Sequence, residues 1–444
     1  MMRRLYTGLI CCAVPFAFAA VLWRGLRDRS YWQGLSERLG RSSRSGEAPA
    51  LWLHAVSLGE MTAAAPLVRA LRLQHPHVPL LLTSATPTGR ARARDLFGDT
   101  VDVRFLPYDM PGAVARFLDA VRPRLGIIME TELWPNLFGE CERRGVPLVL
   151  ASARLSEKSA ARYRRLGGLF HRTAFAISVV GAQTAADAER FIAIGARSDR
   201  THLVGNIKFD VQPGTAMAGR GRELRASFGA ARPVWIAGST HAGEEEQVLA
   251  AQKELLVRRP DALLLLVPRH PGRFQAVADL LGRLQFRFAR RSGGEAADLG
   301  TQVLLVDTVG ELAALYAAAD VAFVGGSLVP VGGHNLLEPA ALGIPVLTGP
   351  HHSNGKDIAE MLILEGGARQ VNDAIQLAAA VAELLSDSNE RRRMGAVGRR
   401  MVESNRGAVS RLLALIEPLL RYPAPPDPAP PDSTPDQGSK RARP

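Results

Sequence analysis

The sequence predicts an α/β protein with two doubly wound, Rossmann-like domains that face a cleft, preceded by a membrane anchor helix. Short apolar strands alternate with helical patterns along the chain, which is typical of parallel sheets covered by helices on both faces. The alternation falls into two sets, and 444 residues with 47% hydrophobic content suffice for two or three cores. The first residues form an apolar run long enough to cross a bilayer.

The apolar run extends from Leu5 to Trp23 without a charged residue. It is flanked on both sides by arginines: Arg3, Arg4, Arg24, Arg27 and Arg29. We interpret residues 1–24 as a retained anchor, because no A-x-A cleavage site follows as a signal peptide would require. The heavier basic flank, residues 24–44, favours the cytoplasmic side for the rest of the chain. At the other end, residues 422–444 are rich in proline and are predicted to be a disordered tail.

The two sets of strands define the domain boundaries. The first set is Leu51–His54, Leu80–Thr83, Leu125–Glu130, Leu148–Ala151, Ala176–Gly181 and His202–Val204. The second set is Val234–Gly238, Leu263–Pro268, Val303–Asp307, Val321–Val324 and Pro345–Thr348. The loosely patterned segment Val211–Gly229 separates them, so we expect domains at residues 25–210 and 211–421.

The residues that follow the strands are the candidate site, because ligands bind at the carboxyl ends of strands in such sheets. In the first set the strands are followed by AVSLGE, ETELWPN and GNIKFD. In the second set they are followed by GSTHAGEEE, PRHPGRF, DTVGEL and GGSLVPVGGHNLLEP. Each segment is polar or contains glycine. Any one of them could be an ordinary loop or a helix cap, as Ser239 or Thr240 before Glu244 would be.

One stretch, VGGHNLLEPAALGIPVLTGP, is informative by itself. Gly332 and Gly333 give the backbone freedom to turn and to approach a ligand. A helix is expected from Asn335 to Leu342, ended by Gly343. Its start would suit a phosphate, and Glu338 would lie within reach of sugar hydroxyls. The alternative is a plain βαβ unit with an acidic first turn.

Composition narrows the class of partner. The net charge of +12, from 55 basic and 43 acidic residues, indicates an anionic surface or ligand. An anionic membrane fits, whereas nucleic acid is not expected because the basic residues lack interleaved aromatic residues. The basic run Arg154 to Arg172 is either a solvated helix face or a surface for an anionic glycolipid. The three cysteines have no metal-ligand spacing.

Together the motifs HAVSLGE, ETELWPN, GNIKFD, GSTHAGEEE, PRHPGRF and GGHNLLEPAALGIPVLTGP resemble the 3-deoxy-D-manno-octulosonic acid (Kdo) transferases of lipopolysaccharide synthesis. The resemblance covers roughly residues 1 to 420. It implies a glycosyltransferase fold of the B type, with an acceptor-binding domain at residues 25–210 and a CMP-sugar-binding domain at 211–421. It also implies inverting transfer of Kdo from CMP-Kdo to a lipid A precursor, lipid IVA, on the cytoplasmic face of a bacterial inner membrane reached by a single-pass anchor.

The resemblance also implies roles for particular residues. Glu60 is expected to be the general base, and Glu130 and Lys208 are expected to stabilise the transition state. The matching CMP-binding segments are Pro268 and Arg269, then Val309, Gly310 and Glu311, and finally Asn335, Leu336, Leu337 and Glu338.

The chemistry is consistent with these roles. One carboxylate suffices as the base for transfer to a hydroxyl. The phosphate leaving group needs positive charge, which Arg269, Lys208 and the helix start near Asn335 would supply. No D-x-D motif occurs in the chain, so we expect neither a metal nor a cofactor. Three alternatives remain open: another nucleotide-sugar enzyme of the same fold, such as a UDP-N-acetylglucosamine 2-epimerase, an anchored binding protein without catalysis, and a nucleic-acid binder.

Overall fold

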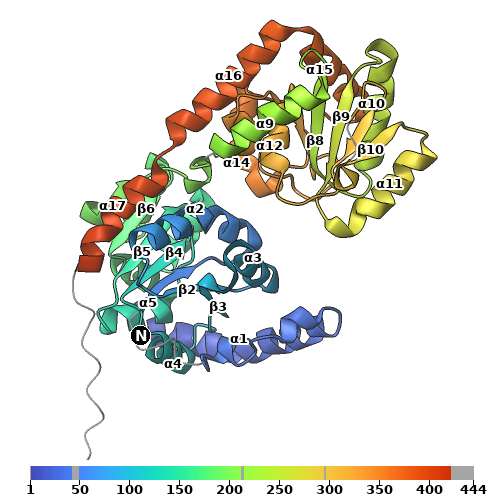
Figure 1. Cartoon of the computed structure of the whole chain (residues 1–444). Helices are drawn as coiled ribbons and strands as arrows, with labels where there is room; N and C mark the ends of the chain where they lie inside the picture. The colour runs from blue at the N-terminus through green and yellow to red at the C-terminus, as the bar shows by residue number, and fades with distance from the viewer. Residues whose placement is uncertain (1, 43–49, 212–214, 295–296, 422–444) are drawn as a thin grey trace, which may run out of the picture. The chain divides into compact units, whose positions relative to one another are not determined.

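The computed structural model describes residues 2–42, 50–211, 215–294 and 297–421. The chain forms two compact units, each built around one seven-stranded parallel sheet (Figure 1). The first unit contains the residues up to Val204 together with those from Ser410 onward, and the second is Gly205–Val409. The predicted tail, residues 422–444, lies outside the described residues.

The sheet of the first unit has the strand order β3-β2-β1-β4-β5-β6-β7. Its strands are β1 (Leu51–His54), β2 (Leu80–Ser84), β3 (Asp102–Phe105), β4 (Leu125–Met129), β5 (Leu148–Ala153), β6 (Val179–Ala182) and β7 (Thr201–Leu203). Its helices are α1 (Met2–Gly25), α2 (Leu58–Gln74), α3 (Pro87–Phe97), α4 (Pro111–Val121), α5 (Pro135–Arg143), α6 (Glu157–Arg165), α7 (Gly168–Phe175) and α8 (Ala185–Ala193), with most of α17 (Ala408–Arg421). The chain reverses its direction of travel across the sheet between β1 and β4, which is the topological switch point.

The sheet of the second unit repeats this plan in the order β10-β11-β9-β8-β12-β13-β14. Its strands are β8 (Val234–Thr240), β9 (Leu263–Pro268), β10 (Phe288–Arg290), β11 (Val303–Leu305), β12 (Val321–Val324), β13 (Val346–Thr348) and β14 (Ala368–Gln370). Its helices are α9 (Thr215–Phe228), α10 (Glu245–Arg258), α11 (Phe274–Arg283), α12 (Leu312–Ala318), α13 (Leu337–Ala341), α14 (Lys356–Leu364), α15 (Ala374–Ser386) and α16 (Ser388–Asn405). The switch point lies between β8 and β12.

The strands are buried on both faces, which explains why they are nearly continuous apolar runs rather than alternating ones. In β8, Val234 and Ile236 belong to one core cluster and Trp235 and Ala237 to another. Successive side chains point to opposite faces of a strand, so each face of the second sheet has its own core beneath its own helices. The predicted class of fold is confirmed.

The boundaries between the units differ from those expected. Residues 410–421 pack on the first unit, because the apolar side chains Leu412 and Ile416 of α17 are fully buried and Arg411 donates to the Val204 carbonyl at 2.9 Å. A helical pattern alone does not tell which sheet a helix covers. The segment Val211–Gly229, expected to be a loose connection, contains the helix α9 from Thr215 onward.

Candidate active site

The loop between β1 and α2 fixes the position of Glu60. Ser57 is the N-cap of α2, and its hydroxyl accepts from the Glu60 N–H at 3.3 Å. In return the Glu60 carboxylate accepts from the Val56 N–H at 2.9 Å and from the Ser57 hydroxyl at 3.4 Å. This reciprocal arrangement is close to a capping box, which holds both side chains in one geometry. Glu60 is half-buried and lies at the carboxyl edge of the first sheet.

Glu130 lies directly after the neighbouring strand β4. It has a φ of 54°, a left-handed conformation that a residue with a side chain rarely adopts, and its N–H donates to the Ala151 carbonyl at 3.0 Å. Such a conformation costs of order 1–3 kcal/mol and is concentrated at functional sites. Burial and the charge of Glu130 raise the pKa of the nearby Glu132 carboxyl. Because β1 pairs with β4, Glu60 and Glu130 follow the two strands that border the switch point.

The buried histidine of β1 does not offer a second base near neutral pH. His54 is fully buried, and its Nδ1 lies 2.9 Å from the Thr83 hydroxyl. Burial lowers the pKa of its imidazole to about 4. We therefore assign His54 to the core of the first sheet.

Lys208 lies in a short 3-10 helix, Ile207–Phe209, whose N-cap Asn206 accepts from the Lys208 N–H at 3.0 Å. The neighbouring Phe209 is buried in the core of the second unit. Lys208 thus belongs to the second unit, whereas the sequence boundaries placed it in the first.

The predicted CMP segments follow three strands of the second sheet. Pro268 ends β9, the turn Val309–Gly310 lies between β11 and α12, and Glu338 lies in α13 after β12. In the strand order β11-β9-β8-β12 these carboxyl ends form one continuous stretch of the sheet edge. The structure therefore brings the three segments to one side of the second unit.

Within these segments the side chains differ in what they can offer a ligand. Val309 is 78% exposed, whereas Leu336 and Leu337 are core residues that could contribute only their backbone. Glu311 forms ion pairs with Arg220 at 2.6 Å and Arg291 at 3.1 Å. The hydrogen bond from Arg291 is the largest cause that lowers the pKa of Glu311, to about 2.

The glycine-rich stretch before α13 folds partly as expected. Gly332 and Gly333 have φ values of 107° and 75°, and Gly343, at 75°, follows the helix. The helix itself has only five residues, since it starts two positions later and ends one position earlier than expected. The Asn335 side-chain oxygen (Oδ1) accepts from the Leu337 N–H, and its side-chain NH₂ group donates to the Glu338 carboxylate at 3.2 Å. Such a short helix has only a small dipole, so the binding of a phosphate group here would depend on side chains.

Sequence reasoning missed the residue that organises the switch point of the second sheet. The Glu244 side chain is fully buried and accepts from the N–H groups of Gly326, Ser327, Leu328 and His241 at 2.7–3.2 Å. It therefore holds the loop after β12 against the loop after β8. The acidic run GEEE was a signal, but three of the four partners of Glu244 lie more than 80 residues away in the sequence. The capping role suggested for Ser239 or Thr240 is wrong, since both residues lie in β8 and Glu244 is the N-cap residue of α10.

Two histidines meet at the same switch point. The Nε2 atoms of His241 and His334 are 2.8 Å apart, their rings are stacked, and His270 contacts His241 edge-on. A hydrogen bond between two ring nitrogens needs one donor and one acceptor. Burial, then the neighbouring His241 and Arg269, lower the pKa of His334 to about 4. Within the described ranges, no group of three His, Cys, Asp or Glu side chains is arranged to hold a metal.

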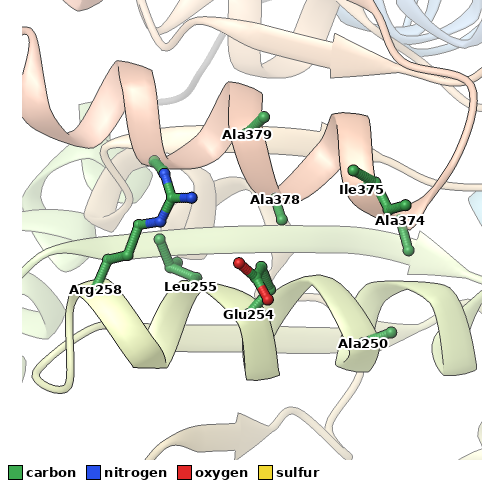
Figure 2. A pocket seen from close by; sticks show the side chains of 9 residues that line it. Ala250, Glu254, Leu255, Arg258, Ala374, Ile375, Ala378 and Ala379 are labelled. Carbon is green, nitrogen blue, oxygen red and sulfur yellow. The ribbon is translucent and has the colours of Figure 1, made fainter.

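A separate hollow of about 420 Å³ lies between α10 and α15 (Figure 2). Alanine and leucine side chains line much of it, with Glu254 and Arg258 as its charged members. None of the predicted site residues lines it, so we assign it no part in the chemistry.

Two Rossmann-like units with polar side chains at both switch points define a fold of the two-domain glycosyltransferase type. Residues 33–211 match the family model of the 3-deoxy-D-manno-octulosonic-acid transferases, and residues 286–401 match that of the group 1 glycosyl transferases. The chain is 42% identical to the 3-deoxy-D-manno-octulosonic acid transferase of Haemophilus influenzae, over 95% of this chain and 99% of the relative. It is 38% identical to that of Bordetella pertussis, over 94% and 99%. The chain belongs to the Kdo transferase family.

Solved structures support the fold independently of sequence. The UDP-N-acetylglucosamine 2-epimerase of Neisseria meningitidis aligns with a TM-score of 0.54 at 12% identity, over 83% of this chain and the whole of that one. At this identity the likeness shows a common fold and no common activity.

Proposed function

We propose that the protein transfers Kdo from CMP-Kdo to a hydroxyl of a lipid A precursor, lipid IVA, with inversion at the anomeric carbon. The observation that carries the proposal is the pair of carboxylates, Glu60 and Glu130, at the switch point of the first sheet in a chain of the Kdo transferase family. The reaction belongs to lipopolysaccharide synthesis. We place it at the cytoplasmic face of the inner membrane, with attachment through α1.

In the proposed reaction Glu60 is the general base. The acceptor oxygen attacks the anomeric carbon of Kdo, its proton passes to the Glu60 carboxylate, and the bond from the anomeric carbon to the phosphate oxygen of CMP breaks. CMP leaves with the electron pair of that bond. Glu60 suits this role because its carboxylate is half-buried and is already oriented by Val56 and Ser57.

The transition state carries positive charge at the sugar and negative charge on the leaving phosphate. We assign stabilisation of the positive charge to Glu130, which directly follows β4. We assign stabilisation of the negative charge to Lys208 and Arg269. The CMP moiety would be held by Pro268 and Arg269, by Val309 to Glu311, and by Asn335 to Glu338. Leu336 and Leu337 would contribute only backbone groups, because their side chains are buried.

The proposed reaction requires no metal ion, and the proposal includes no nucleic-acid partner. The donor leaves as a nucleoside monophosphate, which carries less charge than a diphosphate, and positive side chains would be sufficient to stabilise it. The direct experiment incubates the purified protein with CMP-Kdo and lipid IVA, with and without a chelator. We expect acceptor-dependent release of CMP and a matching gain in acceptor mass in both conditions. Activity lost with the chelator would contradict metal independence alone.

The main competitor is a nucleotide-sugar epimerase of the same fold. Incubation with UDP-N-acetylglucosamine separates the two, since an epimerase would change the configuration of that sugar without an acceptor. Epimerised sugar, or no acceptor-dependent CMP, would contradict the proposed function.

A further inference from the structure

Helix α1 has two opposite faces with different surroundings. Leu5, Leu9, Phe16 and Trp23 are 59–79% exposed, and their spacing of four and seven residues places them on one face. The other face carries the side chains that are buried or half-buried: Thr7, Ile10, Val14, Phe18, Val21 and Gly25. This second stripe runs the whole length of the helix. The helix therefore packs lengthwise on protein and does not project away from it.

Both ends of α1 are tied to the first unit. At its start, Arg3 and Thr7 donate to the Asn136 side chain at 3.2 and 3.0 Å, and the Tyr6 hydroxyl donates to Asp109 at 2.9 Å. At its end, the Trp32 indole N–H donates to the Leu22 carbonyl at 3.0 Å. A few residues later, Glu37 accepts from the Phe105 N–H at 2.7 Å and pairs with Arg90.

These contacts are incompatible with a membrane crossing. A helix of 24 residues is about 36 Å long, and crossing a hydrocarbon core of about 30 Å would put its ends on opposite sides of the bilayer. The start of α1 instead contacts the first unit directly, and the segment after its end packs back on the helix and rejoins the same unit at Glu37. The sequence predicts that α1 crosses the membrane. We propose instead that α1 lies along the surface of an anionic bilayer, with both of its ends on the side of the folded unit.

The occupant of the exposed face follows from its chemistry. Interfacial helices usually have one polar face toward water, but here the protein covers the second face, so α1 can be apolar all round. Arginines lie at both ends and suit lipid phosphates. Arg3 and Arg4 also line a hollow of about 450 Å³ together with Thr7, Pro111 and Asn136.

This orientation has a consequence for the acceptor. Asp109 and Asn136 lie where α4 and α5 begin, after β3 and β4, and so at the carboxyl edge of the first sheet. Glu130 lies at the same edge, six positions before Asn136. A bilayer against α1 would therefore lie beside the edge that carries Glu60 and Glu130, where a lipid-borne acceptor has to arrive.

Single-cysteine labelling tests the topology in the full-length protein. Cys11 and Cys12 are exposed and are replaced by serine, whereas Cys141 is buried and is kept. Met2→Cys and Arg29→Cys report the two ends of α1, and Lys253→Cys reports the folded units. With a membrane-impermeant maleimide, we expect all three to react from the same side, in inverted vesicles or in spheroplasts but not in both. Labelling of Met2→Cys from the side opposite to Lys253→Cys would overturn the proposal.

A depth measurement gives a second, independent readout. Nitroxide labels at Leu5, Leu9, Phe16 and Trp23 in anionic vesicles should lie at nearly equal, shallow depths, and a label at Val14 should be shielded by protein. A profile that is deepest at Phe16 and shallow at both ends would show a crossing helix. Neither readout depends on sugar transfer, so a failure here leaves the proposed reaction untouched.

Discussion

Single carboxylates at the strand ends differ in the donors that surround them. Glu244 is fully buried and accepts from four backbone N–H groups, so its role is to hold two loops together. Glu311 is engaged by two arginines. Glu60 is half-buried, and the Val56 N–H and the Ser57 hydroxyl donate to its carboxylate and help to orient it. Burial thus distinguishes the enclosed, structural Glu244 from the half-buried Glu60.

Glu244→Ala should lower the free energy of unfolding of the second unit by about 3 kcal/mol, because buried N–H groups lose their acceptor. The control Glu246→Ala removes the exposed acid two positions later and should change stability by less than about 0.5 kcal/mol. Urea denaturation of both variants measures this. Equal stabilities for the two variants would show that the loop after β12 does not need Glu244.

Glu338→Ala should weaken binding of CMP by roughly 1.5–3 kcal/mol if the carboxylate accepts charge-assisted hydrogen bonds from the ribose. Glu365→Ala, at an exposed acid that ends α14, is the matched control and should bind CMP as the parent does. Titration calorimetry gives both affinities. Unaltered affinity in folded Glu338→Ala would return this stretch to an ordinary βαβ turn.

At the scale of elements, the two terminal helices of the described chain contact elements that are far away in the sequence. Helix α1 contacts the starts of α4 and α5, and α17 returns to the first unit after the chain has built the second. The two differ in burial: α17 buries Leu412 and Ile416 fully, whereas the buried cluster having its first member at Ala50 contains no residue of α1, and Tyr6 only packs against it.

Deleting residues 1–24 should therefore leave both sheets folded. Asp109 would keep its hydrogen bonds from the Asn136 and Leu137 N–H groups after losing Tyr6. Circular dichroism and CMP affinity should be close to those of the parent, whereas co-sedimentation with anionic vesicles should fall strongly. A truncated chain that cannot fold would make α1 part of the core.

The sequence predicted central strands better than edge strands. Eleven strands were expected, and the three that were missed, β3, β10 and β14, are all outermost in their sheets. An edge strand is covered less completely, so DVRF, FAR and ARQ contain polar residues that hide the apolar run. The strand-end motifs were correctly placed at the carboxyl edges of the two sheets, and their role in a site stays a prediction. The contacts of Glu244, the His241–His334 pair and the docking of α1 were missed because they join residues far apart in the sequence.

At the scale of the whole molecule, each unit carries a histidine whose pKa is lowered to about 4, the buried His54 in the first and the half-buried His334 in the second. Burial is the main cause in both, since it disfavours the charged imidazole. The unfolded chain therefore binds these protons more tightly than the native one. Stability linked to them is present above the unfolded value of 6.5 and is lost as the pH falls toward 4.

Both units should accordingly unfold at lower urea concentration at about pH 5 than at about pH 7. His334→Asn should reduce this pH dependence in the second unit, whereas the control His77→Asn, at an exposed position, should leave it unchanged. Stability that stays constant or rises on acidification would contradict the assignment of neutral histidines at these two positions.

The central claim is that Glu60 is the base for transfer, and the alternative is that it only caps α2. Ser57→Ala measures the effect of losing the cap alone, since it removes the cap hydroxyl and keeps the Glu60 carboxylate. It should lower the melting temperature slightly, consistent with a cap worth about 1 kcal/mol, and should keep most of the turnover.

The most direct measurement is the turnover of purified Glu60→Gln with CMP-Kdo and lipid IVA. Glutamine keeps an oxygen that can accept from the Val56 N–H, so the turn into α2 should survive while the proton acceptor is lost. We expect turnover to fall by roughly 10²–10⁴-fold, with CMP affinity and melting temperature close to those of the parent. Turnover within about threefold of the parent would contradict the proposed mechanism.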